Sequence, residues 1–171
     1  MDEITQEFAS DISEGSLLVS FDYNGASYEA WSLTKALEMG VPAVVLAGAL
    51  KPGALVAIDA ATSVARGRYL TSGIGQDSTY LAKASEAEAF LQAGRPADAS
   101  AYFLLKPEAD ARGITVADLA VEVIAARDAW HQVAGEIEGV RISGKALVTN
   151  AGTADEVQAA SAQVIERLAA L

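Results

Sequence analysis

The stretch TVADLAVEVIAARDAWHQVAGEI, residues 115–137, predicts a long amphipathic helix. Its apolar side chains recur every three or four residues, which places them on one face of a helix with 3.6 residues per turn. Thr115 and Asp118 have the spacing of a capping box, with aspartate in the place of the usual glutamate. We expect the helix to begin here and to reach about Val148. Three glycines weaken it, at about 1 kcal/mol each relative to alanine: Gly135, Gly139 and Gly144.

A second helix is predicted after the turn at residues 150–152. Thr153 and Glu156 form a complete capping box, and the apolar positions that follow step by four, three, four and three residues. This spacing is typical of the seam of a short coiled coil. Three seam residues are therefore candidates for contact with another protein: Val157, Val164 and Leu168. Because the connection is short, we expect the last two helices to pack antiparallel.

Helical periodicity also extends upstream of residue 115. Residues 79–91 show clear helical periodicity, and this periodicity ends at Gly94 to Pro96. Residues 101–112 form a short amphipathic piece that contains Pro107 and stops at Gly113.

The first third of the chain has β-strand and turn signals in addition to helical ones. Two β-rich runs flank Asn24-Gly25, a pair that supplies the positive φ angles of a tight type I′ hairpin turn. A short helix is expected from Leu33 to Met39. The apolar runs 43–50 and 54–59 are separated by Lys51-Pro52-Gly53, a turn signal that favours two further strands.

The predicted fold class is therefore α+β: a small N-terminal β-hairpin or sheet unit, then a mainly α-helical domain that ends in an antiparallel helical hairpin. The expected organisation has three parts. They are an acidic N-terminal segment at 1–15, a small α+β unit with its linker at 16–77, and a helical domain at 78–171.

Composition excludes several kinds of partner and chemistry. The 171 residues carry a net charge of −11, which nucleic acids and anionic membrane surfaces would repel. The longest strongly apolar run, residues 41–49, is far shorter than the roughly 20 residues of a membrane span. With no cysteine and one histidine, the chain lacks the usual metal ligands and nucleophiles, so we expect no metal, no cofactor and no catalytic residue.

Two glycine patterns and the histidine are candidate chemical sites. Residues 139–145 match the spacing of a phosphate-binding loop, but Ala146 stands where the magnesium-binding hydroxyl belongs and the context is helical. Residues 73–78 resemble a dinucleotide fingerprint that lacks its third glycine. His131 has no second histidine to complete a metal set, which favours a surface or packing role.

Aromatic and basic residues supply the other candidate contacts. Tyr23, Tyr28 and Trp31 lie on or beside the hairpin, where strand alternation groups Tyr28 with Ser32 rather than with Trp31. A core role and a contact surface both remain open for them. The remaining candidates are Arg66 and Arg68, expected to form an ion pair within or between chains, and Trp130 on the long helix.

The segment from Asp59 to Ile165 resembles a helical segment of structural and tail-associated proteins of tailed bacteriophages. The resemblance depends on the order and spacing of many short elements. They are Ile58 to Ala61, Ala65-Arg66, Arg68 to Thr71, Gly75-Gln76, Tyr80, Lys83, Glu86-Ala87, Gly113 to Thr115, Trp130, Ile137-Glu138, Arg141 and Thr153 to Val157. The chain departs from the family pattern at Tyr102 to Leu105 and between Gly135 and Gly144. The resemblance brings no catalytic residues.

The resemblance implies a non-enzymatic virion accessory protein of the head or tail, including a decoration role, assembled in the host cytoplasm. Its partners would be other virion proteins and further copies of itself. A cytosolic phage assembly chaperone or adaptor is the alternative, and a nucleotide-binding enzyme that uses residues 139–145 is a third hypothesis.

Overall fold

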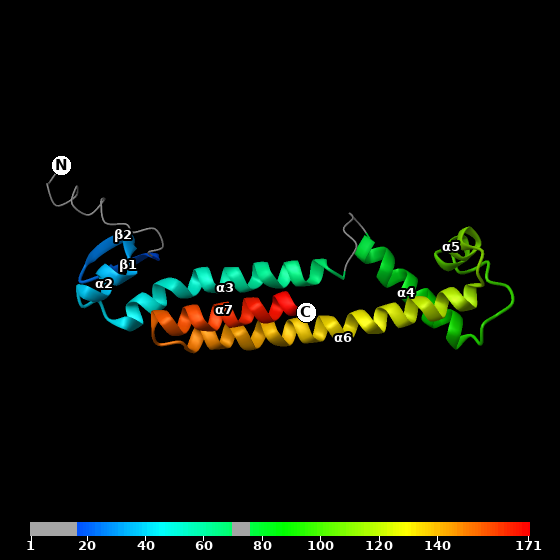
Figure 1. The fold of residues 1–171 in the computed structure, drawn as a ribbon. Coiled ribbons are helices and arrows are strands. Elements are labelled where there is room, and N and C mark those ends of the chain that lie inside the picture. The colour runs from blue at the N-terminus through cyan, green and yellow to red at the C-terminus, as the bar shows by residue number, and fades with distance from the viewer. Residues whose placement is uncertain (1–16, 70–75) are drawn as a thin grey trace. The chain divides into compact units, whose positions relative to one another are not determined.

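A computed structural model describes residues 17–69 and 76–171 and has the α+β fold predicted from the sequence (Figure 1). The predicted acidic segment 1–15 lies outside the described residues. The elements are β1 (Leu18–Tyr23), β2 (Ala26–Ser32), α2 (Leu33–Glu38), α3 (Ala43–Gly67), α4 (Gln76–Gln92), α5 (Leu105–Arg112), α6 (Val116–Asn150) and α7 (Ala154–Ala170).

The described chain divides into two compact units. Unit 1 combines residues 17–62 with Gly139–Ala170, and unit 2 comprises Ser63–Glu138 with Leu171. The division predicted near residue 77 does not coincide with these units. Helices α3 and α6 each contribute one part to each unit, so a boundary based on composition along the chain misses the division.

The β-hairpin forms where it was predicted. Asn24 and Gly25 have φ angles of 51° and 79°, as a type I′ turn requires. An irregularity in the ladder follows: Phe21 pairs with Tyr28, but Val19 pairs with Trp31. Ser20 of β1 therefore lies opposite two residues of β2, Glu29 and Ala30, which is a β-bulge. At the bulge, Ala30 has a φ of 52° and its N–H donates to Ser20 Oγ at 3.0 Å.

The predicted strands at 43–50 and 54–59 are wrong: both runs belong to the continuous helix α3. Pro52 lies inside this helix, where proline lacks an N–H donor and costs about 3 kcal/mol. One face of α3 is buried at helical spacing, and this burial offsets the cost. In unit 1 the buried residues of that face are Leu46, Ala47, Ile58 and Thr62.

Within the described residues, α3 is also the one helix that is long and apolar enough to cross a membrane. Its most apolar 18-residue window has a mean hydropathy of 1.6, and 17% of that window is buried. The sequence interpretation took residues 41–49 as the longest strongly apolar run, so it underestimated the length of the apolar segment.

In unit 1, α6 and α7 form the predicted antiparallel hairpin (Figure 1). The turn is stabilised by the predicted capping box: Glu156 N–H donates to Thr153 Oγ1 at 3.2 Å, and the Glu156 carboxylate accepts from the N–H of Thr153. The seam residues Val157, Val164 and Leu168 are buried at 1%, 4% and 1% exposure. They form contacts inside this chain, which corrects their assignment as contacts for another protein.

In unit 2, α4, α5 and the first part of α6 surround a second small core. Its buried residues are Ala87, Phe90, Ala99, Leu105, Ala109, Leu119 and Ala120. Phe90 packs edge-on against Tyr102, with ring centroids 5.0 Å apart. Glu86 on α4 accepts hydrogen bonds from the N–H groups of Leu104 and Leu105, which holds the start of α5 against α4. The predicted stop at Gly113 is confirmed by its left-handed φ of 66°.

Candidate protein-binding pocket

A pocket of about 560 Å³ opens between α4, α5 and α6 in unit 2, and we call it the α4–α6 pocket. This volume lies in the range of about 300–1,000 Å³ that is usual for ligand sites. It is lined by Tyr69, Tyr80, Leu81, Lys83, Glu108, Arg112, Leu119, Glu122, Val123, Ala126, Arg127, Trp130 and His131.

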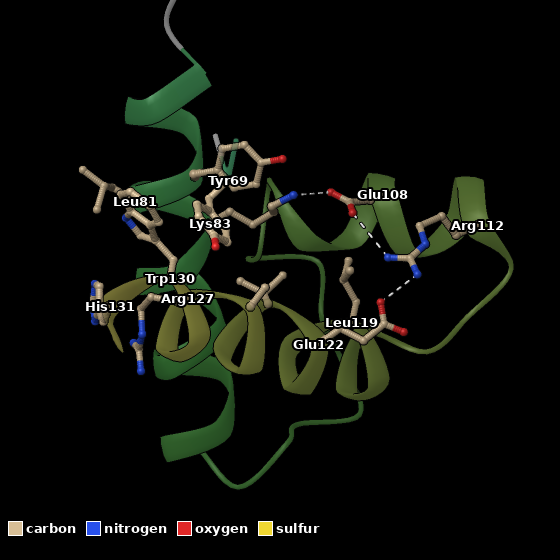
Figure 2. Close-up of a pocket in the computed structure, with 13 residues that line it drawn as sticks. Tyr69, Leu81, Lys83, Glu108, Arg112, Leu119, Glu122, Arg127, Trp130 and His131 are labelled. Atoms are coloured by element: carbon tan, nitrogen blue, oxygen red, sulfur yellow. Dashed lines mark hydrogen bonds and ion pairs between the residues drawn. The ribbon is translucent and has the colours of Figure 1, made fainter. Parts of the chain in front are cut away.

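One side of the pocket is aromatic and apolar (Figure 2). The rings of Tyr69 and Trp130 lie 6.3 Å apart at 38° to each other, and the Tyr69 hydroxyl donates to the backbone carbonyl of Leu171. Tyr80 is 51% exposed and Leu81 is 68% exposed, so this side offers apolar surface that residues 17–69 and 76–171 leave uncovered. Such amphipathic aromatic side chains are typical of the energetic centres of protein interfaces.

The opposite side is closed by a chain of ion pairs that joins the three helices (Figure 2). Lys83 Nζ lies 2.8 Å from Glu108 Oε2. Arg112 bridges Glu108 at 3.5 Å and Glu122 at 2.7 Å. The hydrogen bond from Lys83 lowers the pKa of Glu108, and the hydrogen bond to Glu122 raises the pKa of Arg112. These groups therefore stay charged near neutral pH and fix α5 between its neighbours.

The third lining cation, the guanidinium of Arg127, is held as well. It pairs with Glu88 of α4 and with the adjacent Asp128, whose carboxylate lies 2.8 Å away. These contacts raise the pKa of Arg127, the hydrogen bond to Asp128 most strongly. Lys83, Arg112 and Arg127 thus all have carboxylate partners. An anionic ligand would have to displace those partners, whereas an apolar or aromatic group would meet open surface on the other side.

Of the predicted site residues, Trp130 alone lines this pocket. Arg66, in the same unit, makes an ion pair with Glu138 at 2.7 Å, which is the intramolecular alternative of the sequence interpretation. Arg68 lies exposed on the turn that follows α3. His131, a lone histidine in the sequence, is an exposed lining residue.

The hairpin aromatics lie in unit 1 and pack together. Tyr28 stacks on Phe21 at 4.9 Å and meets Trp31 edge-on at 5.0 Å. Simple alternation separated Tyr28 from Trp31, but the extra residue in the β-bulge returns them to the same face. Tyr23, Tyr28 and Trp31 are half-buried against the cluster that contains Val19 and Leu46. Their core role is therefore clear, and their exposed edges remain available for contact.

The phosphate-loop pattern at residues 139–145 lies within α6 and forms no loop. Lys145 Nζ is 2.7 Å from Asp59 Oδ2, and Arg141 reaches Asp59 Oδ1 at 3.2 Å. The hydrogen bond from Lys145 lowers the pKa of Asp59, so the lysine serves as a cross-link between α3 and α6. Residues 73–75 of the other pattern, 73–78, lie outside the described residues, and its last three residues begin α4. Residues 17–69 and 76–171 contain no cluster of three or more acidic or histidine side chains that could hold a metal ion.

Sequence reasoning placed Tyr80 and Lys83 on a helix stripe but did not identify the pocket. Its ion pairs join residues that are 25 and 10 positions apart on different helices, such as Lys83 with Glu108 and Arg112 with Glu122. No local spacing reveals such pairs. The only available signal was the aromatic residues Tyr69, Tyr80 and Trp130 in a chain with 6% aromatics.

In comparisons with models of protein families, with curated proteins and with solved structures, nothing matches this chain.

Proposed function

We propose that this chain is a non-enzymatic component of the tailed-bacteriophage particle, where it acts through protein–protein contacts made by the α4–α6 pocket. The location is supported by the ordered residue series between Asp59 and Ile165 that resembles phage structural proteins. In this proposal, the protein is assembled in the host cytoplasm and retained in the virion.

The observation that carries the binding role is the division of the pocket into two sides. Tyr80 and Leu81 are more than half exposed, while the cations that line the pocket, including Lys83 over the Tyr80 ring, are neutralised by Glu108, Glu122 and Glu88. This combination favours an apolar or aromatic side chain of a partner protein, surrounded by a polar rim. It offers no free charge to a phosphorylated substrate.

The test is mass spectrometry of purified particles from a phage that encodes the chain. We expect the protein in the particles at a constant ratio to the major structural proteins. Its presence in infected lysates together with its absence from particles would contradict the proposal and indicate an assembly chaperone or adaptor.

A matched pair of variants tests whether incorporation into the particle depends on the pocket. The double variant Tyr80→Ser/Leu81→Ser removes exposed apolar surface without opening a core, and we expect about a tenfold loss of incorporation, typical of a central interface contact. Val121→Ser is the control, because Val121 is exposed on α6 and does not line the pocket. Equal incorporation of the two variants would contradict the role of the pocket.

Calorimetric titration with ATP and magnesium tests the non-enzymatic part of the proposal. We expect no binding heat. We also expect an unchanged melting temperature, because only a ligand that binds the folded state would raise the melting temperature. Binding that depends on Lys145 would overturn this part.

A further inference from the structure

The turn that joins β1 to β2 presents an asparagine followed by a glycine to solvent. Asn24 and Gly25 are both exposed. In a two-residue turn the ladder hydrogen bonds belong to the flanking pair, here Tyr23 and Ala26, so the Gly25 N–H is not part of the ladder. Gly25 has no Cβ, and beyond its chain neighbours no described atom lies within 4 Å of the position that a Cβ would take. The backbone nitrogen of Gly25 is therefore unobstructed.

We propose that Asn24-Gly25 is a spontaneous deamidation site, at which Asn24 converts through a cyclic imide to aspartate and isoaspartate. The two reacting groups belong to adjacent residues, so the reaction needs no second molecule to bring them together. The Gly25 backbone nitrogen loses its proton to solvent base and attacks Cγ of Asn24. A new N–C bond closes the five-membered imide, and the side-chain nitrogen takes up a proton and leaves as ammonia. Water then opens the imide at one of its two carbonyls, and no oxidant or reductant is required.

The other asparagine of the chain, Asn150, is an internal comparison. It is also exposed, at the end of α6, so exposure alone does not distinguish the two positions. The nitrogen that would attack belongs to Ala151, whose N–H donates to the carbonyl of Leu147 at 3.1 Å. Ala151 is 8% exposed and carries a Cβ. At Asn150 the reaction would have to break the end of the helix first, whereas at Asn24 no ladder hydrogen bond of Gly25 has to break.

The two products have different effects on the hairpin. Aspartate preserves the turn, because Asp-Gly forms type I′ turns as readily as Asn-Gly does. Isoaspartate adds one methylene group to the main chain, because the chain then runs through the former side chain. The length of the turn sets the register of a hairpin, so this addition opposes the pairing of Tyr23 with Ala26. Isoaspartate therefore loosens the end of the ladder next to the stacked rings of Phe21 and Tyr28.

Peptide mapping by mass spectrometry tests the site. The folded full-length protein is incubated at mildly alkaline pH, and the peptides that contain each asparagine are followed over time. We expect the Asn24 peptide to gain the mass difference between an amide and a carboxylic acid about tenfold faster than the Asn150 peptide, or more, which corresponds to about 1.4 kcal/mol of activation free energy. No conversion at Asn24 in the folded protein, or equal rates at both asparagines, would overturn the proposal.

Two variants separate the chemistry from its consequence. Asn24→Gly removes the reactive amide and keeps a pair that forms type I′ turns, so its peptide should show no mass change. Asn24→Asp reproduces the aspartate product. In hydrogen exchange, the Tyr23 and Ala26 amides should keep their protection in Asn24→Asp and lose it in the isoaspartate fraction, which an isoaspartate-specific methyltransferase identifies. Equal protection in the two would overturn the opening of the turn. These results do not depend on whether the chain is found in phage particles.

Discussion

Gly144 of α6 packs directly against Val164 of α7. A Cβ placed on Gly144 would lie 2.4 Å and 2.6 Å from the two γ-carbons of Val164 and 3.1 Å from its Cβ. Val164 is β-branched and buried in a helix, so its side chain has little freedom to move away. The glycine that weakens the helical pattern in the sequence is therefore a point of close approach between α6 and α7.

Gly144→Ala should destabilise the protein by about 1–3 kcal/mol, the usual cost of overpacking a core. Gly139→Ala on the same helix is the matched control. It meets nothing within 4 Å and should stabilise the protein by up to about 1 kcal/mol through helix propensity. Urea unfolding at neutral pH measures both. The substitution Val164→Ala in the Gly144→Ala background should recover part of the loss, and strictly additive effects would argue against the contact.

Pro52→Ala tests the continuity of α3. In a helix the alanine restores a missing N–H donor and removes the clash of the proline ring, and Pro52 is exposed, so no packing is lost. We expect the free energy of unfolding to rise by up to about 3 kcal/mol. If residues 51–53 formed a turn between strands, the same substitution would lower the melting temperature.

Ala30→Gly tests the β-bulge. Alanine at a φ of 52° is strained by roughly 1–2 kcal/mol, which glycine relieves at some cost in backbone entropy. We expect a small net gain in stability, about 0.5–1 kcal/mol. Ala26→Gly, an exposed position of the same strand without a positive φ, should lower stability instead. The same sign for both variants would be inconsistent with the bulge.

Glu108 should contribute to the pH dependence of stability. Its pKa is lowered from 4.5 in the folded protein, so its stabilising contribution is present above pH 4.5 and is lost as the pH falls through the lower, folded value. The stability difference between wild type and Glu108→Gln should therefore be largest at neutral pH and should shrink below pH 4.5. Unfolding curves at pH 7 and pH 3 measure it, with exposed Glu136→Gln as the control. A difference that grows at acidic pH would contradict the ion pair with Lys83.

Local sequence signals identified much of the fold, because turns and caps depend on nearby residues. Asn24-Gly25, Gly113 and the capping residues Thr115 and Thr153 all act as predicted. The error at α3 arose because Lys51-Pro52-Gly53 is a local turn signal, which packing of the buried face overrides.

The candidate pocket was harder to predict from the sequence than the fold. Trp130 was identified, but its neighbour Tyr69 and the Lys83–Glu108 pair are brought together only by tertiary structure. The seam through Val164 was recognised as a helix contact, yet spacing alone does not distinguish a partner inside the chain from one outside it.

Site-specific photo-cross-linking from the pocket tests the central claim most directly. A photoreactive phenylalanine analogue at Leu81, 68% exposed on the aromatic side, is activated in intact particles, and the same analogue at Val121 serves as the control. The account predicts a covalent adduct between position 81 and another particle protein, with little or none from position 121. No adduct from position 81, or equal adducts from both positions, would contradict the claim that the α4–α6 pocket binds protein.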